Sequence, residues 1–202
     1  MSQTSVLTVG ILIFNEVEVL DFCGPFEVFS VARLAGQHSD AQQLFRAVTI
    51  AETDDIVTCR GDLLVKPHAT IEHHPPLDIL VVPGGQGTRK EMHNQRLVDW
   101  IKQQDQRTQL TTSVCTGAFL LAEGGLLSEH RATTHWGSIQ WMRDTYPQIS
   151  ILDDVRVVDE GRIITSAGIS AGIDMSLHVV ERLYGREAAA WTARRMEYDW
   201  RA

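Results

Sequence analysis

Several features that would decide the class of this protein are missing from its 202 residues. No apolar stretch approaches the roughly 20 residues of a membrane-spanning helix, and residues 1–5 carry no basic segment of the kind that begins a signal peptide. The formal net charge is −8, from 18 lysines and arginines against 26 acidic residues, and the basic residues form no run. We therefore expect a cytoplasmic protein that binds neither membranes nor nucleic acid.

Cysteine is also scarce. The three cysteines are Cys23, Cys59 and Cys115, an odd number without the paired spacing of a zinc site. The adjacent His73 and His74 lack an acidic or cysteine partner at ligand spacing, so the sequence predicts no metal site. Without a secretion signal, reduced thiols are the default, and we expect Cys23 and Cys59 to be inert.

Proline is sparse as well, at six residues, and no linker or internal repeat divides the chain. Short β-favouring apolar runs alternate with helix-length segments. The predicted strands cover 6–14, 46–50, 78–82, 109–113 and 161–165, and the predicted helices cover 25–35, 88–105, 117–122, 138–146, 171–184 and 186–198. Such alternation is typical of a mostly parallel sheet with helices on both faces, so we predict one α/β domain over 1–202. Two β-like pieces within 54–69 predict a hairpin added to this sheet.

Three turns are expected to meet at one edge of the sheet. They follow the predicted strands, at 15–24, 83–87 and 113–117. In open α/β sheets the ligand site lies beyond the carboxyl ends of the strands. The topology alone therefore predicts a site formed by these turns.

The turn at 113–117 contains the residue most suited to chemistry, Cys115. A sharp strand-to-helix turn exposes a nucleophile, as in the G-x-S-x-G elbow, and Gly117 would let the helix pack closely. Ser113 stands where that motif has its first glycine, so the match is partial. The following helix offers N–H groups that favour a thiolate. The alternative is that Cys115 is a small buried hydrophobe, a common fate of a free cysteine.

The turn at 83–87 contains Gly84 and Gly85 after a buried-type strand. It has neither the Lys-Ser/Thr of a P-loop nor dinucleotide glycine spacing. The Gly85 N–H, facing the Thr116 N–H, would form a two-donor oxyanion hole. The alternative is an ordinary tight turn.

Asp21 is the candidate acid, since it lies among apolar residues just before a predicted helix that starts at Gly24-Pro25. Burial beside the thiol would raise the pKa of this carboxyl, so that it could carry a proton near neutrality. The alternative is that Asp21 caps the helix. Other nearby acids are Glu16, Glu18 and Glu27.

His135 follows the cysteine helix and could return to the site as a substrate-binding residue. A lone histidine beside a tryptophan, here Trp136, is more often structural. His68, His73 and His74 are expected in loops.

Taken together, these segments resemble the DJ-1/PfpI (ThiJ/PfpI) superfamily, and within it the isocyanide hydratase branch and the amidase-like domains of AraC-type regulators. The segments that carry the resemblance are 20–25, 82–85, 112–117, 124–127, 131–136 and 167–174. They extend over nearly the whole chain in the right order.

The resemblance implies a flavodoxin-like sandwich, usually a homodimer, with Cys115 as nucleophile, Asp21 beside the thiol and Thr116 after it. It implies an enzyme that adds water to a small-molecule isocyanide and gives an N-substituted formamide, without metal or organic cofactor. The alternative is a non-catalytic or redox-sensing domain like those of the regulators.

Other activities of the superfamily fit this chain less well. The peptidase branch has His where this chain has Thr116, and glyoxalases usually have Glu where Asp21 stands. Amidase activity also ranks below the hydratase.

Overall fold

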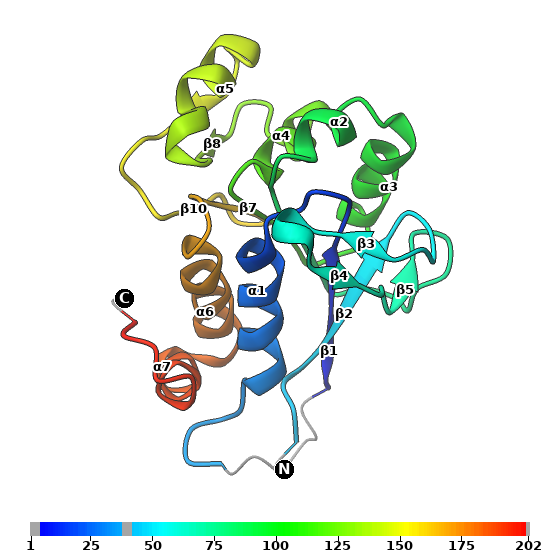
Figure 1. Cartoon of the computed structure of the whole chain (residues 1–202). Helices are drawn as coiled ribbons and strands as arrows, with labels where there is room; N and C mark the ends of the chain where they lie inside the picture. Colours follow the sequence, from blue (N-terminus) through cyan, green and yellow to red (C-terminus); the bar gives the residue numbers. More distant parts are fainter. Residues whose placement is uncertain (1–4, 38–41, 201–202) are drawn as a thin grey trace.

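A seven-stranded sheet forms the centre of the computed structural model, which describes residues 5–37 and 42–200 (Figure 1). In spatial order its strands are β10 (Val157–Asp159), β11 (Ile163–Ser166), β7 (Leu110–Val114), β6 (Ile79–Val82), β1 (Leu7–Leu12), β2 (Phe45–Ala51) and β5 (Ala69–Thr70). All neighbouring pairs are parallel except β10 with β11. The predicted α/β class with a mostly parallel sheet is confirmed. Residues 1–4, on which part of the signal-peptide expectation rests, lie outside the described residues, as do 201–202.

Helices cover both faces of this sheet (Figure 1). On one side lie α1 (Val19–Val31), α6 (Ala171–Tyr184) and α7 (Arg186–Arg195), which contact one another, and on the other lie α2 (Thr88–Glu91), α3 (Gln95–Asp105) and α4 (Gly117–Glu123). Because the sheet is covered twice, β6 and β7 are buried along their whole length. The continuous apolar sequence of β6 predicts this, whereas β7 is buried although its sequence is Leu-Thr-Thr-Ser-Val. Across the described ranges, no helix is both long and apolar enough to cross a bilayer.

The helix predicted to begin at Gly24-Pro25 begins six residues earlier, at Val19, and this places Asp21 inside its first turn. Pro25 lies in the interior of α1, where it has no N–H to donate to the Asp21 carbonyl. Contacts outside the helix fix its start, since the Glu18 N–H donates to the Gly84 carbonyl at 2.9 Å. The alternative that Asp21 caps this helix is therefore wrong.

The predicted helix over 88–105 is two helices, α2 and α3, because Asn94 caps the second one. Its side chain accepts a hydrogen bond from the Leu97 N–H. Asn is among the preferred residues at this position, so the break had a signal in the sequence.

The hairpin predicted within 54–69 exists, but its predicted place in the main sheet is wrong. Strands β3 (Val57–Thr58) and β4 (Leu64–Val65) pair only with each other, on either side of a 3₁₀ turn, η1 (Arg60–Asp62). A second small pair, β8 (Arg131–Ala132) with β9 (Ser150–Ile151), lies beside η2 (Trp136–Ser138) and α5 (Ile139–Thr145).

Candidate active site

The carboxyl ends of four neighbouring strands, β11, β7, β6 and β1, form one edge of the sheet. The three predicted turns follow three of these strands and converge there, as the topology requires. Val17 pairs with Gly85 in an isolated bridge, which joins the first two turns. The turn after β11, at 167–170, is a fourth contributor that the sequence prediction missed. The same topological rule, applied to the predicted strand at 161–165, would have included it.

Cys115 lies at the point where β7 turns into α4, with φ at +56°. A left-handed backbone is strained for any residue with a side chain, by about 1–3 kcal/mol, so the surroundings must hold it. The Cys115 N–H donates to the carbonyls of Ser166 and Ala167, at 3.2 and 3.3 Å. The Thr134 hydroxyl donates to the Cys115 carbonyl at 2.8 Å. The predicted elbow is therefore present, and hydrogen bonds to both the N–H and the carbonyl of Cys115 hold its backbone.

Gly117 allows α4 to begin directly against the neighbouring strand. A Cβ atom at this position would lie 2.0 Å from the carbonyl oxygen of Val82, closer than any side chain can approach. The prediction that a small residue here permits close helix packing is confirmed.

Asp21 reaches the elbow from α1 and is completely buried. Its Oδ2 accepts a hydrogen bond from the Gly84 N–H at 3.0 Å, whereas Oδ1 has no hydrogen-bond partner among the described residues. Burial raises the pKa of this carboxyl to about 7, although the Gly84 N–H and the neighbouring Cys115 thiol both favour the ionised form. Asp21 can thus hold or release a proton near neutral pH.

Cys115 is also buried, with 6 % of its surface exposed. Burial and, after it, the charge of Asp21 raise the pKa of the thiol to about 12, while the Thr116 N–H lowers it. The Thr116 N–H at the helix start favours the thiolate, as expected, but desolvation outweighs it and leaves the pKa of the thiol raised. Interacting groups of this kind titrate as a pair. Between the two pKa values, about 7 and about 12, Cys115 and Asp21 together hold one proton.

Thr116 and the glycine turn form a closed polar network. The Gly85 N–H donates to Thr116 Oγ1 at 3.0 Å, and this oxygen also lies 3.0 Å from the Thr88 hydroxyl. A Cβ on Gly85, whose φ is +131°, would lie 2.4 Å from the Glu18 nitrogen. The oxyanion hole expected from the Gly85 and Thr116 N–H groups is not available in that form, since the Gly85 N–H already donates to Thr116 Oγ1.

A pocket of about 500 Å³ opens onto the elbow and is called the Cys115 pocket below. It is lined by Glu18, Arg60, Gly85, Gln86, Arg89, Cys115, Thr116, His135, Trp136, Gly137, Ser138 and Ile169. His135 thus lies where the sequence predicts, and its Nδ1 accepts from the Gly137 N–H, which leaves the proton of a neutral ring on Nε2. Arg89, Trp136 and Ile169 were missed, because only folding brings them to the cysteine.

The remaining candidates lie apart from the elbow chemistry or support it indirectly. Glu18 lines the pocket and its charge raises the pKa of Asp21, whereas Glu16 and Glu27 are exposed. Burial raises the pKa of both Cys23 and Cys59, that of Cys59 to about 11. No group of three or more metal-binding side chains occurs within the described part of the chain. The Nδ1 atom of His68 is bonded to Thr49, and Nε2 of His74 accepts from Trp100.

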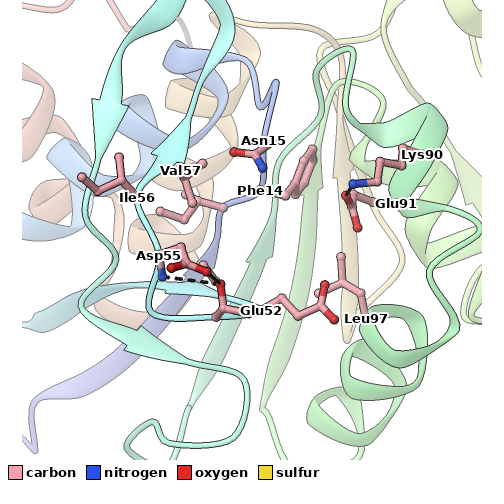
Figure 2. Close-up of a pocket in the computed structure, with 12 residues that line it drawn as sticks. Phe14, Asn15, Glu52, Asp55, Ile56, Val57, Lys90, Glu91 and Leu97 are labelled. Carbon is pink, nitrogen blue, oxygen red and sulfur yellow. Dashed lines mark hydrogen bonds and ion pairs between the residues drawn. The ribbon is translucent and has the colours of Figure 1, made fainter.

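A second pocket lies at the same sheet edge, beyond β1 and β2 (Figure 2). It has a volume of about 160 Å³, and its carboxylates are Glu52, Asp55 and Glu91, so it is called the acidic pocket below. Each carboxylate has a partner: Asn94 donates to Glu52 and Glu91, and Thr53 donates to Asp55. No motif in the sequence announces this pocket.

Comparisons with known proteins agree with this geometry. The DJ-1/PfpI family model matches residues 7–182. An isonitrile hydratase of Pseudomonas putida is 35% identical over 192 residues, which are 95% of this chain and 78% of that protein. Isonitrile is a synonym of isocyanide.

Two further relatives define the range of the similarity. The HTH-type transcriptional regulator GbdR of Pseudomonas aeruginosa is 27% identical over 95% of this chain, which spans only 51% of the regulator. The crystal structure of a ThiJ/PfpI family protein from Pseudomonas syringae superimposes with a TM-score of 0.85 at 27% identity, covering 98% of this chain and 78% of that one. The chain is therefore similar both to an enzyme and to part of a transcriptional regulator.

Proposed function

The chain belongs to the DJ-1/PfpI family, and we propose that it is a cysteine-dependent hydratase that adds water to an isocyanide and releases an N-substituted formamide. The observation that carries this proposal is the burial of Asp21 and Cys115 side by side at a strained elbow, where the pKa of both groups is raised. The similarity to an isonitrile hydratase supplies the reaction class. Such a pair provides a sulfur nucleophile and a proton donor at one point, which is what the terminal carbon of an isocyanide requires.

In the first step, the Cys115 sulfur and the proton of Asp21 both add to the terminal carbon of R–N≡C. With the shared proton on Asp21, the Cys115 sulfur is a thiolate and forms a bond to this carbon. The proton of Asp21 passes to the same carbon, giving the thioimidate R–N=CH–S–Cys115. Protonation of Asp21 also removes the negative charge that raises the thiol pKa. The state in which Asp21 can donate a proton is therefore also the state that favours the Cys115 thiolate.

Hydrolysis of the thioimidate restores the pair. Asp21, now a carboxylate, takes a proton from water as the hydroxyl adds to the carbon, and passes this proton to the nitrogen. The carbon–sulfur bond then breaks while the hydroxyl proton goes to Asp21. The products are R–NH–CHO and the original Cys115–Asp21 pair, so no external oxidant or cofactor is needed.

The neighbouring residues position this pair. The Thr116 N–H faces the sulfur and favours its anionic form. Gly84 orients the Asp21 carboxyl through its N–H, and Gly85 orients Thr116. His135 lines the pocket and offers Nε2–H to a substrate or water.

Incubation of the protein with several simple alkyl isocyanides, with formamide followed by NMR, tests the proposal. The wild-type protein should form formamide catalytically, and the Cys115→Ala variant should not. Absence of turnover across the panel would refute the hydratase, and turnover by Cys115→Ala would refute the mechanism.

A second candidate function is a ligand-sensing domain without catalysis. The observation that favours it is the match to a transcriptional regulator over nearly the whole chain. A sensor of this kind would bind a ligand in the Cys115 pocket and release it unchanged. Recovery of intact ligand after prolonged incubation, together with a ligand-dependent rise in melting temperature, would favour the sensor over the hydratase.

We also propose that two copies associate, in the cytoplasm, as the family resemblance implies. The β3–β4 hairpin supports this, because Ile56, Leu63 and Leu64 are 57 %, 44 % and 63 % exposed. Apolar side chains grouped in this way are typical of protein–protein contacts. Light scattering should give twice the 22.6 kDa chain mass, and Leu64→Glu should shift it toward one chain. A monomeric wild-type protein would refute the dimer.

A further inference from the structure

The charged side chains of the Cys115 pocket are unevenly paired. Arg60 lies 3.5 Å from the Glu18 carboxylate, which offsets its charge. Arg89, which lines the same pocket, makes no ion pair with any residue that the structure describes. The pocket therefore contains one exposed guanidinium whose charge is not balanced by a carboxylate.

This guanidinium is nevertheless held in place. It lies 5.2 Å from the ring centroid of Trp141, which in turn stacks on Phe119 of α4 at 4.0 Å. The preceding residue, Thr88, is hydrogen-bonded to the elbow, since its hydroxyl lies 3.0 Å from that of Thr116. An arginine that packs one face on an aromatic ring keeps its N–H edge free for a planar anion.

The lining of the pocket also includes exposed apolar side chains. Trp136 is 79 % exposed and Ile169 is 37 % exposed, and both line the same pocket as Cys115. The pocket volume of about 500 Å³ far exceeds what an isocyano group alone would occupy. The remaining space fits a substituent that has an apolar body and one anionic end.

We propose that the Cys115 pocket selects isocyanides whose substituent bears a carboxylate, bound by Arg89. This inference rests on the proposed hydratase function and adds the substrate class. A carboxylate suits the site better than a phosphate, because one guanidinium matches the two oxygens of a carboxylate and no second unpaired cation lines the pocket among the described residues.

Steady-state kinetics with isocyanoacetate and its methyl ester test the inference, because the ester lacks the negative charge and differs otherwise only by one methyl group. The wild-type protein should prefer isocyanoacetate by about tenfold or more in kcat/KM, as one charge-assisted pair of hydrogen bonds would give. Arg89→Gln should raise KM for isocyanoacetate and bring the two values of kcat/KM within about threefold. Equal use of both substrates by the wild type would overturn the proposal.

Lys90 provides a matched control. It is the next residue of α2, and Lys90→Gln removes the same charge, but Lys90 lines the acidic pocket instead (Figure 2). Lys90→Gln should keep the preference for isocyanoacetate. Loss of the preference in both variants would mean that net charge, and not a contact with Arg89, produces it, and would overturn the assignment of Arg89.

Binding to Cys115→Ala separates this inference from the proposed function. Calorimetry with N-formylglycine, the expected product, should show tighter binding than with its methyl ester, and Arg89→Gln should abolish the difference. Selective binding without turnover of any isocyanide would refute the hydratase while supporting a carboxylate site. Turnover without selective binding would refute the carboxylate site alone.

Discussion

The Cys115 pocket and the acidic pocket lie at the same edge of one sheet, and residues of α2 line both of them. The two sites differ in the hydrogen bonding of their buried acids. In the acidic pocket, Glu91 is buried but its carboxylate accepts a hydrogen bond from Asn94 at 2.9 Å. In the other site, one oxygen of the fully buried Asp21 has no partner among the described residues. Desolvation by burial raises the pKa of Asp21 to about 7 and outweighs the hydrogen bond from the Gly84 N–H.

The difference shows which buried acid is poised for chemistry. Glu91 accepts a hydrogen bond from the side chain of Asn94, which also caps α3, so Glu91 has a structural role. A carboxyl that is desolvated next to a thiol has an accessible neutral form and a second group to exchange a proton with. Both acids are buried, so burial alone does not distinguish the two sites. The raised pKa of Asp21 beside the Cys115 thiol does.

The largest expected effect comes from removing the nucleophile. Cys115→Ala should lower kcat for an alkyl isocyanide by roughly three orders of magnitude or more, because no other group can form the covalent intermediate. Glu91→Gln, in the acidic pocket, should change kcat by less than about threefold. Rates measured under saturating isocyanide check both values. A comparable loss of kcat in both variants would contradict the assignment of the reaction to the Cys115 pocket.

Replacing the acid gives the next largest effect. Asp21→Asn should lower kcat by about 100- to 1,000-fold, the usual contribution of a general acid–base. It should also lower the pKa of the Cys115 thiol, since the carboxylate charge that raises it is gone. Ultraviolet absorbance of the thiolate during a pH titration measures this shift. A thiol pKa that rises in Asp21→Asn would contradict the coupling.

Asp21→Asn, which should lower activity, should raise the free energy of unfolding relative to wild type at higher pH. The folded-state pKa of Asp21 is raised from 3.8 to about 7, so its favourable contribution is complete below about pH 4 and is lost as the pH rises through 7. The stability of Asp21→Asn relative to wild type should therefore increase between about pH 5 and pH 8, by about 2–3 kcal/mol.

Urea denaturation at both pH values measures this, and Glu91→Gln is the matched control. Glu91→Gln should lower the free energy of unfolding by about 1 kcal/mol, since its carboxylate accepts a hydrogen bond in the folded state. Equal pH dependence of wild type and Asp21→Asn would show that the Asp21 pKa is not raised.

The smallest effect concerns the anchoring of the elbow. Thr134→Val removes the hydrogen bond to the Cys115 carbonyl and should reduce kcat by about tenfold while leaving the pH profile of the reaction in place. Thr53→Val, which removes the bond to Asp55 in the acidic pocket, should leave kcat within about twofold. A shifted pH profile in Thr134→Val would indicate that this residue acts on the proton of the pair and not on backbone geometry.

The sequence predicts the edge of the sheet, the elbow and its nucleophile, because these depend on strand order and on local residue types such as Cys115 and Gly117. It does not predict where α1 begins, since Pro25 is a helix-start signal that the contact between Glu18 and Gly84 overrides. The thiol pKa and the occupied Gly85 N–H also escape prediction. Both depend on groups from distant segments that only the folded chain brings together.

The dependence of kcat/KM on pH, for a simple alkyl isocyanide and the wild-type protein, tests the central claim that Cys115 and Asp21 act as a pair with one shared proton. The rate of formamide formation should rise through an apparent pKa near 7 and then remain level, because the active form has lost the first proton of the pair and kept the second. No formamide at any pH, or a rate that shows no change near pH 7 and climbs toward pH 12 as a lone buried thiol would, contradicts the account.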